Sequence, residues 1–409
     1  MEAVLPARMG TPFRWLVGSA WASNLGDGIG LAAGPLLVAS QTSDPLLVAL
    51  AGLLQRLPWL LFGLYAGVLA DRVNRRLLVV AVDLMRAATL VVLTLAVATG
   101  HVDITVVLVT MFLLGTAEVF ADTAVHTLLP MVVAKADLGI GNARMMAAGL
   151  TMNQMVGPAI GAVLFAAGRA WPFLLQALCV ALGAVLVSRM LLPALDRRGG
   201  PSHVGRDIAE GFRWTWGNRA VRTLTLAIVT FNVTYGAAWS VLVLYAIQRL
   251  DLGAIGFGLL TTVGAVGGIA GTASYDWLER HASLASIMRV GLLVETFTML
   301  GLAVTTRPWV AMSILFFFGA HAFIWGTTSR TVRMRAVPVH LQGRVGSLYS
   351  IGVFGGIVAG QGLGGVIARI WGVTGPFWFA FVGSAVILAL IWRELGYIAH
   401  ADEVELSTA

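Results

Sequence analysis

Charged residues, lysine and cysteine are all scarce in this sequence. Only 11% of its 409 residues are charged, whereas about a quarter of the residues in a typical soluble protein are. Hydrophobic residues make up 58% of the chain, and the mean hydropathy is +0.85. This balance excludes a soluble enzyme, a disordered scaffold and a secreted disulfide framework, and it predicts an integral membrane protein.

Cysteine pairs and catalytic motifs are missing as well. The single cysteine, Cys179, lies in an apolar run, so neither an internal disulfide nor a cysteine-based metal site can form. No P-loop, HExxH motif, Gly-x-Ser-x-Gly motif or paired Asp-rich prenyltransferase motif occurs. We therefore expect no metal, no cofactor and no direct use of ATP, and a membrane enzyme or a non-transporting receptor becomes a distant alternative.

Long apolar stretches dominate the chain instead. Runs such as 106–114 and 178–187 are apolar on nearly every face, unlike the alternating strands of a membrane β-barrel. A helix needs about 20 such residues to cross a bilayer. The sequence therefore predicts an all-α membrane protein with twelve transmembrane helices, at about 15–38, 46–69, 77–99, 104–128, 144–168, 172–193, 222–246, 254–277, 285–305, 309–329, 344–368 and 375–396.

Basic residues are distributed unevenly around these spans. An even number of spans places both termini on one side, and segments on that side contain 21 of the 27 Lys and Arg residues, against four on the opposite side. The other two, Arg56 and Arg86, fall inside spans. Cytoplasmic segments are enriched in Lys and Arg, so we expect cytoplasmic termini and a plasma (inner) membrane location. Topology then explains the net charge of +7, and no nucleic-acid partner is expected.

A polar stretch near the midpoint of the chain suggests a division into two halves. It runs from about 193 to 222 and ends with an amphipathic pattern, typical of a helix on the membrane surface, formed by Ile208, Phe212, Trp214 and Trp216. We expect an N-terminal six-helix bundle at 1–193, a cytoplasmic linker with the amphipathic segment at 194–221, and a C-terminal six-helix bundle with a short tail at 222–409.

Spaced glycines indicate that the two halves are repeats. The pair Gly157 and Gly161 in span five recurs as Gly360 and Gly364 in span eleven, at an offset of 203 residues. A second pair recurs at an offset of 204: Gly67 and Arg76 match Gly271 and Arg280. Units with an even number of spans insert in the same orientation, so the copies would be parallel repeats.

Residues 67–76, between spans two and three, read Gly-Val-Leu-Ala-Asp-Arg-Val-Asn-Arg-Arg. This run resembles the cytoplasmic loop signature of the major facilitator superfamily, G-x-L-a-D-R-x-G-R-R. Asn74 replaces a glycine, and Asn tolerates the left-handed backbone that a tight turn needs. We expect Gly67 to allow close helix approach, Asp71 to pair with arginines or a helix N-terminus, and the arginines to bind anionic headgroups. A plain positively charged loop is the alternative to a conformational element made of Gly67, Asp71, Arg72, Arg75 and Arg76.

Further stretches resemble the same superfamily. Residues 153–162 are similar to its antiporter signature, G-x-x-x-G-P-x-x-G-G, with Asn153 and Ala162 in place of two glycines. Gly157, Pro158 and Gly161 would form a hinge between the halves, or only a packing kink. Local similarity to drug and siderophore exporters, including macrolide efflux proteins and enterobactin exporters, occurs at 23–27, 57–59, 83–86, 210–213 and 343–345. The resemblance covers nearly the whole chain and implies two six-helix bundles.

Ionisable residues inside the spans are candidates for proton coupling, because burying them without a function is costly. Asp27 in span one and Glu118 in span four lie near mid-depth, and Asp122 follows Glu118 on the same helix face. Arg56, as the only basic group near the membrane centre, is expected to pair with Asp27 or Glu118. The alternatives are that Asp27 only caps backbone loosened by nearby glycines, and that Glu118 only satisfies Arg56.

Three other intramembrane residues have simpler interpretations. Asp83 and Arg86, at i and i+3 in span three, are expected to form a structural ion pair. Glu295 in span nine is interpreted as a protonated carboxyl bonded to Thr296 or Thr298.

The facilitator fold places spans one, four, seven and ten around a central cavity. His321 in span ten lies at the depth of the cavity and is a further proton-coupling candidate, with a neutral hydrogen-bonding histidine as the alternative. Aromatic walls suit a bulky amphipathic ligand, although aromatic residues are also ordinary packing in membrane helices. The candidate substrate residues are Asn24, Trp21, Phe231, Tyr235, Trp239, Phe323 and Trp325.

The sequence as a whole favours a monomeric secondary transporter. It would export a hydrophobic or amphipathic small molecule, such as a drug, natural product or siderophore, in exchange for protons, as its halves alternate access to a central site. A lysophospholipid flippase or an uptake carrier of the same fold is the main alternative.

Overall fold

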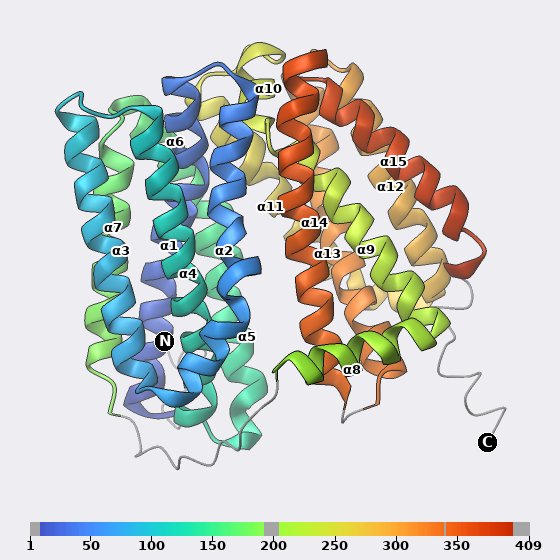
Figure 1. Cartoon of the computed structure of the whole chain (residues 1–409), viewed down its shortest axis with the longest axis horizontal. Helices are drawn as coiled ribbons and strands as arrows, with labels where there is room; N and C mark the ends of the chain where they lie inside the picture. The colour runs from blue at the N-terminus through green and yellow to red at the C-terminus, as the bar shows by residue number, and fades with distance from the viewer. Residues whose placement is uncertain (1–8, 192–203, 339–340, 396–409) are drawn as a thin grey trace. The chain divides into compact units, whose positions relative to one another are not determined.

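The computed structural model describes residues 9–191, 204–338 and 341–395, apart from the side chains at 71, 204–208 and 220. Every regular element in these ranges is a helix (Figure 1). The first nine elements are α1 (Gly10–Gln41), α2 (Pro45–Arg72), α3 (Arg75–Ala98), α4 (Ile104–Val132), the 3-10 helix η2 (Lys135–Asp137), α5 (Leu138–Ala148), the π-helix η3 (Gly149–Val156), α6 (Gly157–Ala167) and α7 (Trp171–Ser188). The others are α8 (Val204–Gly217), α9 (Arg219–Trp239), α10 (Leu242–Gln248), α11 (Ala254–His281), α12 (Leu284–Val304), α13 (Pro308–Ala336), α14 (Gln342–Trp371) and α15 (Gly375–Ile391).

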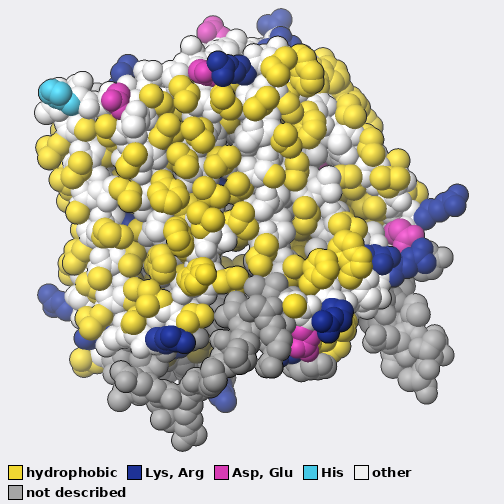
Figure 2. Space-filling model, in the orientation of Figure 1, with side chains coloured by type: hydrophobic (Ala, Val, Ile, Leu, Met, Phe, Trp, Pro, Cys, Tyr) yellow, Lys and Arg dark blue, Asp and Glu magenta, His cyan; other side chains and the backbone are white. Residues whose placement is uncertain are grey.

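Each of the twelve predicted spans corresponds to one helix or to consecutive helical segments. Within the described residues, ten helical stretches are long and apolar enough to cross a membrane, and α15, with 17 residues, is a shorter apolar helix. The long helix α1 is not among the ten, in keeping with its polar residues Asn24 and Asp27. Figure 2 shows hydrophobic side chains over the middle of the helices on the visible face and charged side chains near the helix ends, as a bilayer requires.

Polar residues at the start of several helices explain where they begin. Asn74 accepts a hydrogen bond from the backbone N–H of Leu77 (3.3 Å) and so caps α3. Its φ of −68° and ψ of 107° are extended. The turn therefore does not use the left-handed backbone that asparagine tolerates, and the side chain of Asn74 acts as a helix cap instead. Asp103 and Asn218 cap α4 and α9 in the same way.

The chain folds as two compact units. Unit 1 contains Met1–Ser43, Leu54–Gly200 and Leu252–Thr262, and unit 2 contains Asp44–Leu53, Pro201–Asp251 and Val263–Ala409. The first turns of α2 thus belong to unit 2, and the first turns of α11 belong to unit 1. Hydropathy does not reveal such an exchange of helix ends, and the division at 193 and 222 stays a prediction.

Unit 1 is built around a close contact between α1 and the continuous segment η3–α6. A methyl group added at Gly157 would lie within 3.0 Å of the backbone of Gly28, and one at Gly161 within 3.0 Å of the carbonyl oxygen of Ile29. The helix widens to a π-helix immediately before Gly157, and α6 continues through Pro158. Gly157, Pro158 and Gly161 therefore lie on a packing surface inside unit 1, and a hinge at these residues stays a prediction.

Unit 2 repeats this contact between α9 and α14. Methyl groups at Gly360 and Gly364 would lie within 3.0 Å of the carbonyl oxygens of Val233 and Ala237. The equivalent glycine pairs at an offset of 203 residues thus perform the same packing in both units. This shared packing supports an internal repeat.

The amphipathic segment forms α8, which packs against the other helices of unit 2. Glu210 pairs with Arg344 of α14 (2.7 Å), and Trp214 packs against a buried cluster that includes Val337. Phe212 and Trp216 are stacked on each other and are each 48% exposed. One apolar side of α8 is thus covered by the unit, and two aromatic rings stay available to a membrane surface.

Candidate functional site

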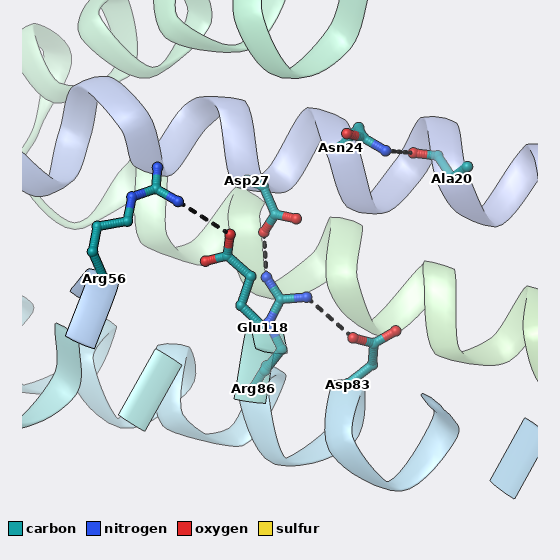
Figure 3. A network of polar contacts seen from close by, with 7 residues as sticks. All are labelled: Ala20, Asn24, Asp27, Arg56, Asp83, Arg86 and Glu118. Carbon is teal, nitrogen blue, oxygen red and sulfur yellow. Dashed lines mark hydrogen bonds and ion pairs between the residues drawn. The ribbon is translucent and has the colours of Figure 1, made fainter. Parts of the chain in front are cut away.

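Arg86 of α3 joins two carboxylates in the interior of unit 1. Its Nη1 donates to Oδ1 of Asp83 at 3.2 Å, and its Nη2 donates to Oδ1 of Asp27 of α1 (Figure 3). The side chains of Arg86 and Asp83 are each only 4% exposed. Because a buried ion pair is costly to break, this contact fixes α1 to α3. The predicted Asp83–Arg86 pair is confirmed, and its extension to Asp27 is new.

Arg56 of α2 forms a looser contact with Glu118 of α4. Its Nη1 lies 3.9 Å from Oε1 of Glu118, beyond hydrogen-bond distance, and the side chains are 34% and 21% exposed. The structure thus selects Glu118, and not Asp27, from the two partners expected for Arg56. The statement that Arg56 is the only basic group near the membrane centre was wrong, because Arg86 is bound to Asp27, which was predicted to lie at that depth.

Asp122 lies one turn after Glu118 in α4 and is partly buried. Among the described residues no ion pair includes Asp122. The guanidinium of Arg86 lies close enough to Asp27, Asp83, Glu118 and Asp122 to interact electrostatically with all of them. We call these four acids together with Arg56 and Arg86 the charge cluster. It contains four carboxyl groups but only two guanidinium groups. Because its acids outnumber its cations, the cluster can bind protons or a cationic ligand.

The remaining α1 candidates, Trp21 and Asn24, both precede Asp27 along the helix. Asn24 is one turn from Asp27, and its Nδ2 donates to the backbone carbonyl of Ala20 at 2.8 Å (Figure 3). Trp21 is partly buried against a hydrophobic cluster of unit 1 that includes Phe13 and Leu128. Trp21 thus contributes to the packing of unit 1, whereas Asn24 adjoins the charge cluster.

The surroundings of Gly67, the glycine of the loop signature, differ from the prediction. A methyl group added at Gly67 would meet no atom within 4 Å. Within the described residues, no helix comes close to Gly67, in contrast to the predicted close approach. The side chain of Asp71 lies outside the described residues, and Arg72 is exposed.

The other two signature arginines bind helix ends inside unit 1. Arg75 donates through Nε to the carbonyl oxygen of Ala70 (3.1 Å) and through Nη1 to that of Thr127 (3.5 Å). Arg76 donates through Nη1 to the carbonyl oxygen of Met190 at 2.7 Å. These bonds satisfy carbonyl groups near the ends of α2, α4 and α7. Both side chains therefore connect helices in unit 1, a role that the predicted binding of lipid headgroups did not include.

Unit 2 carries an aromatic stack where unit 1 carries charges. Along α9, the rings of Phe231 and Tyr235 are 6.0 Å apart and those of Tyr235 and Trp239 are 4.4 Å apart. Phe318 of α13 completes the stack, 4.9 Å from Trp239 and 6.2 Å from Tyr235. Sequence reasoning missed Phe318, although its position three residues before His321 on a helix is a signal for the same face.

The other candidates on α13 face neighbouring helices of unit 2. Trp325 is 5% exposed within a hydrophobic cluster that includes Leu292. Phe323 lies where a methyl group on Gly268 of α11 would contact its ring, and His321 lies in the same way against Gly291 of α12. Trp325 and His321 are thus core residues of unit 2 in this structure, because Gly291 of α12 leaves room for both rings.

Glu295 of α12 is buried without a visible partner. It is 0% exposed, and within the described residues neither carboxyl oxygen has a hydrogen-bond partner. The expected bond to a threonine is absent there: Thr296 donates to the backbone carbonyl of Leu292 instead (2.8 Å). The interpretation of Glu295 as bonded to Thr296 or Thr298 was therefore wrong.

Comparison with known proteins identifies the family. A family model described as transmembrane secretion effector matches residues 3–406, nearly the whole chain. The chain belongs to this family of the major facilitator superfamily. It is therefore a multi-pass membrane transporter and not an enzyme, and the resemblance seen in the loop signature is confirmed.

Proteins similar to this chain include efflux pumps. The multidrug efflux pump Tap of Mycolicibacterium fortuitum is 27% identical over 369 residues, which cover 85% of this chain and 88% of the pump. Macrolide efflux protein A of Streptococcus pyogenes is 23% identical over 204 residues, covering 48% of this chain and 49% of that protein. A bacterial homologue of the iron transporter ferroportin, solved in an inward-facing state, superposes with a TM-score of 0.74 at 14% identity and covers 94% of this chain and 98% of its own. This last likeness shows the fold alone.

Proposed function

We propose that this transporter exports a hydrophobic or amphipathic small molecule in exchange for protons. It would act as a monomer in the plasma membrane with both termini in the cytoplasm. The relatives named as multidrug and macrolide efflux pumps support export of such compounds. The uneven distribution of Lys and Arg supports the topology.

The observation that carries proton exchange is the contrast between the two arginines of the charge cluster. Arg86 is buried and held by two acids, whereas Arg56 meets Glu118 at 3.9 Å in a partly exposed contact. A proton added to Glu118 would cancel its charge and release Arg56, while Asp27 and Asp83 keep Arg86 in place. Glu118 is therefore the acid whose protonation changes the cluster at the least cost.

The proton would then leave by a short route. Asp122 lies one helical turn from Glu118 on the cytoplasmic side of the proposed topology. It can accept the proton from Glu118 and pass it to the cytoplasm, after which Glu118 attracts Arg56 again. The aromatic stack of unit 2 offers flat apolar surface to the exported molecule.

Transport into everted membrane vesicles with an imposed pH gradient tests this proposal. We expect Glu118→Gln to abolish gradient-driven transport of a macrolide and of ethidium while substrate binding persists, because glutamine keeps the shape but exchanges no proton. Glu279→Gln, at the exposed pair with Arg335, is the matched control. Gradient-driven transport that survives in the Glu118→Gln variant would move the coupling site to Asp122, Asp27 or His321. Wild-type transport that ignores the gradient would refute antiport.

A further inference from the structure

An apolar groove lies between α12 and α15 of unit 2, and none of its lining residues belongs to the charge cluster or to the aromatic stack. Its volume is about 640 Å³. Its lining comes from the middle of α12 (Leu293, Thr296 and Phe297), from α15 between Phe381 and Leu390, and from three residues that follow α15: Trp392, Arg393 and Glu394. Apart from Thr296 and the last two, all of these side chains are apolar.

The surface around the groove is suited to hydrocarbon. Phe297, Val386 and Leu390 are 61%, 52% and 73% exposed. In a membrane protein, exposed apolar side chains of this density contact lipid chains. From Phe381 to the end of α15 at Ile391 the groove follows roughly 15 Å of helix, which is about half of the 30 Å hydrocarbon thickness of a bilayer.

One end of the groove is positively charged. Arg393 lines it, and the guanidinium of Arg289 lies 5.4 Å from the ring centroid of Trp392 while its Nε donates to the carbonyl oxygen of that residue (3.3 Å). The acid at this end, Glu394, is already paired, since Arg219 donates to both its oxygens at 2.9 and 2.6 Å. These hydrogen bonds hold the pKa of Glu394 below its usual range, so it stays ionised and bound to Arg219. Within the described residues, no ion pair neutralises Arg393 or Arg289.

We propose that this groove binds one anionic phospholipid, with an acyl chain along α12 and α15 and the phosphate at Arg393 and Arg289. The apolar lining alone would accept the chain of any phospholipid. Two guanidinium groups at one end distinguish an anionic headgroup from a zwitterionic one, because basic side chains at a membrane surface attract anionic lipid. The proposal is independent of the transported substrate and of proton exchange.

Native mass spectrometry of the full chain in detergent, with an equal mixture of phosphatidylglycerol and phosphatidylcholine, tests the headgroup. We expect wild type to retain one phosphatidylglycerol in preference to phosphatidylcholine, and Arg393→Gln to lower this preference by about fivefold. Arg393→Lys should keep most of it. Arg280→Gln, which removes a charge from the end of α11 in the same unit, should leave it unchanged. Equal retention of both lipids by wild type, or equal losses in Arg393→Gln and Arg280→Gln, would overturn the proposal.

A second pair of variants tests the acyl chain. Ala385→Phe fills the groove, so we expect it to lose the retained lipid whatever the headgroup. Val382→Phe adds the same ring on an exposed part of α15 outside the lining and should keep the lipid. Elution as a single folded species in size-exclusion chromatography shows that both variants fold. Retention of phosphatidylglycerol by Ala385→Phe at the wild-type level would place the lipid elsewhere.

Discussion

Unit 1 and unit 2 use the same glycine contact between two helices, but they fill the space beside it with different chemistry. At the offsets of the glycine repeat, Asp27 of α1 corresponds to Phe231 of α9 (204 residues), and Glu118 of α4 corresponds to His321 of α13 (203 residues). The first position of each pair belongs to the charge cluster. Of the second positions, Phe231 belongs to the aromatic stack, and His321 packs close to Phe318, the α13 member of that stack.

This difference shows that two units with the same helix packing can carry side chains suited to different functions. Backbone contacts through glycine do not depend on the side chains of neighbouring turns, so they tolerate charge in one copy and aromatic rings in the other. Acids and arginines suit the handling of protons, and flat rings suit the handling of an apolar molecule. Four substitutions test this difference between the two units.

Removing Arg86 should damage unit 1 most. Arg86→Gln leaves Asp27 and Asp83 without their shared cation in the interior, and breaking such a buried pair costs about 3–5 kcal/mol. We expect a much lower midpoint of thermal unfolding in detergent. Arg169→Gln, at an exposed position, is the control. Adding Asp27→Asn should recover part of the loss, and a loss that Asp27→Asn deepens would show that the two residues do not act as a pair.

Adding side chains to the glycine contact should harm both units alike. Gly161→Leu in α6 and Gly364→Leu in α14 each push a side chain into a facing backbone, and overpacking of this kind costs about 1–3 kcal/mol or more. We expect similar losses of folded protein by fluorescence-detected size exclusion. Gly63→Leu in α2 meets open space and serves as the control. Tolerance of leucine at only one of the two positions would contradict the equivalence of the units.

Removing one ring from the aromatic stack should weaken substrate binding without affecting the fold. For Trp239→Ala, which removes contacts to Tyr235 and Phe318, we expect the substrate concentration for half-maximal transport to rise by about tenfold. Phe317→Ala removes the neighbouring, exposed ring and should have little effect. Unchanged transport by Trp239→Ala of both a macrolide and ethidium would exclude the stack from substrate binding.

Replacing Glu295, the isolated acid of unit 2, should change stability least. It should raise the stability of the folded protein, whereas the other changes lower stability or function. Glu295→Met removes two buried oxygens without partners in the described residues and keeps the length of the side chain, so we expect stabilisation of about 1 kcal/mol. The matched change in unit 1, Asp83→Leu, should destabilise, because that acid is paired with Arg86. Thermal unfolding of both variants measures the difference. A destabilised Glu295→Met protein would indicate a partner for the carboxyl in the folded state.

Much of the fold could be predicted from the sequence because its determinants are local. A run of about 20 apolar residues must form a helix in a bilayer, since lipid offers no hydrogen bonds to the backbone. All twelve predicted spans accordingly match helical segments, and the i to i+3 spacing of Asp83 and Arg86 already predicted their ion pair. The loop signature likewise identified the superfamily from ten consecutive residues.

The site depended on contacts between distant residues. Asp27 is 59 positions from Arg86, and Phe318 belongs to a different helix from the rest of the aromatic stack. The sequence does not show either contact, because a pattern along one helix indicates which residues share a face but not which neighbour meets that face. Gly67 shows the converse: its motif predicts a close helix approach, but in the part of the chain that the structure describes a methyl group added there would meet no atom within 4 Å. The helices, the superfamily and the kinds of residue at the site thus follow from local patterns in the sequence, whereas the packing of the helices fixes which charges pair and which rings stack.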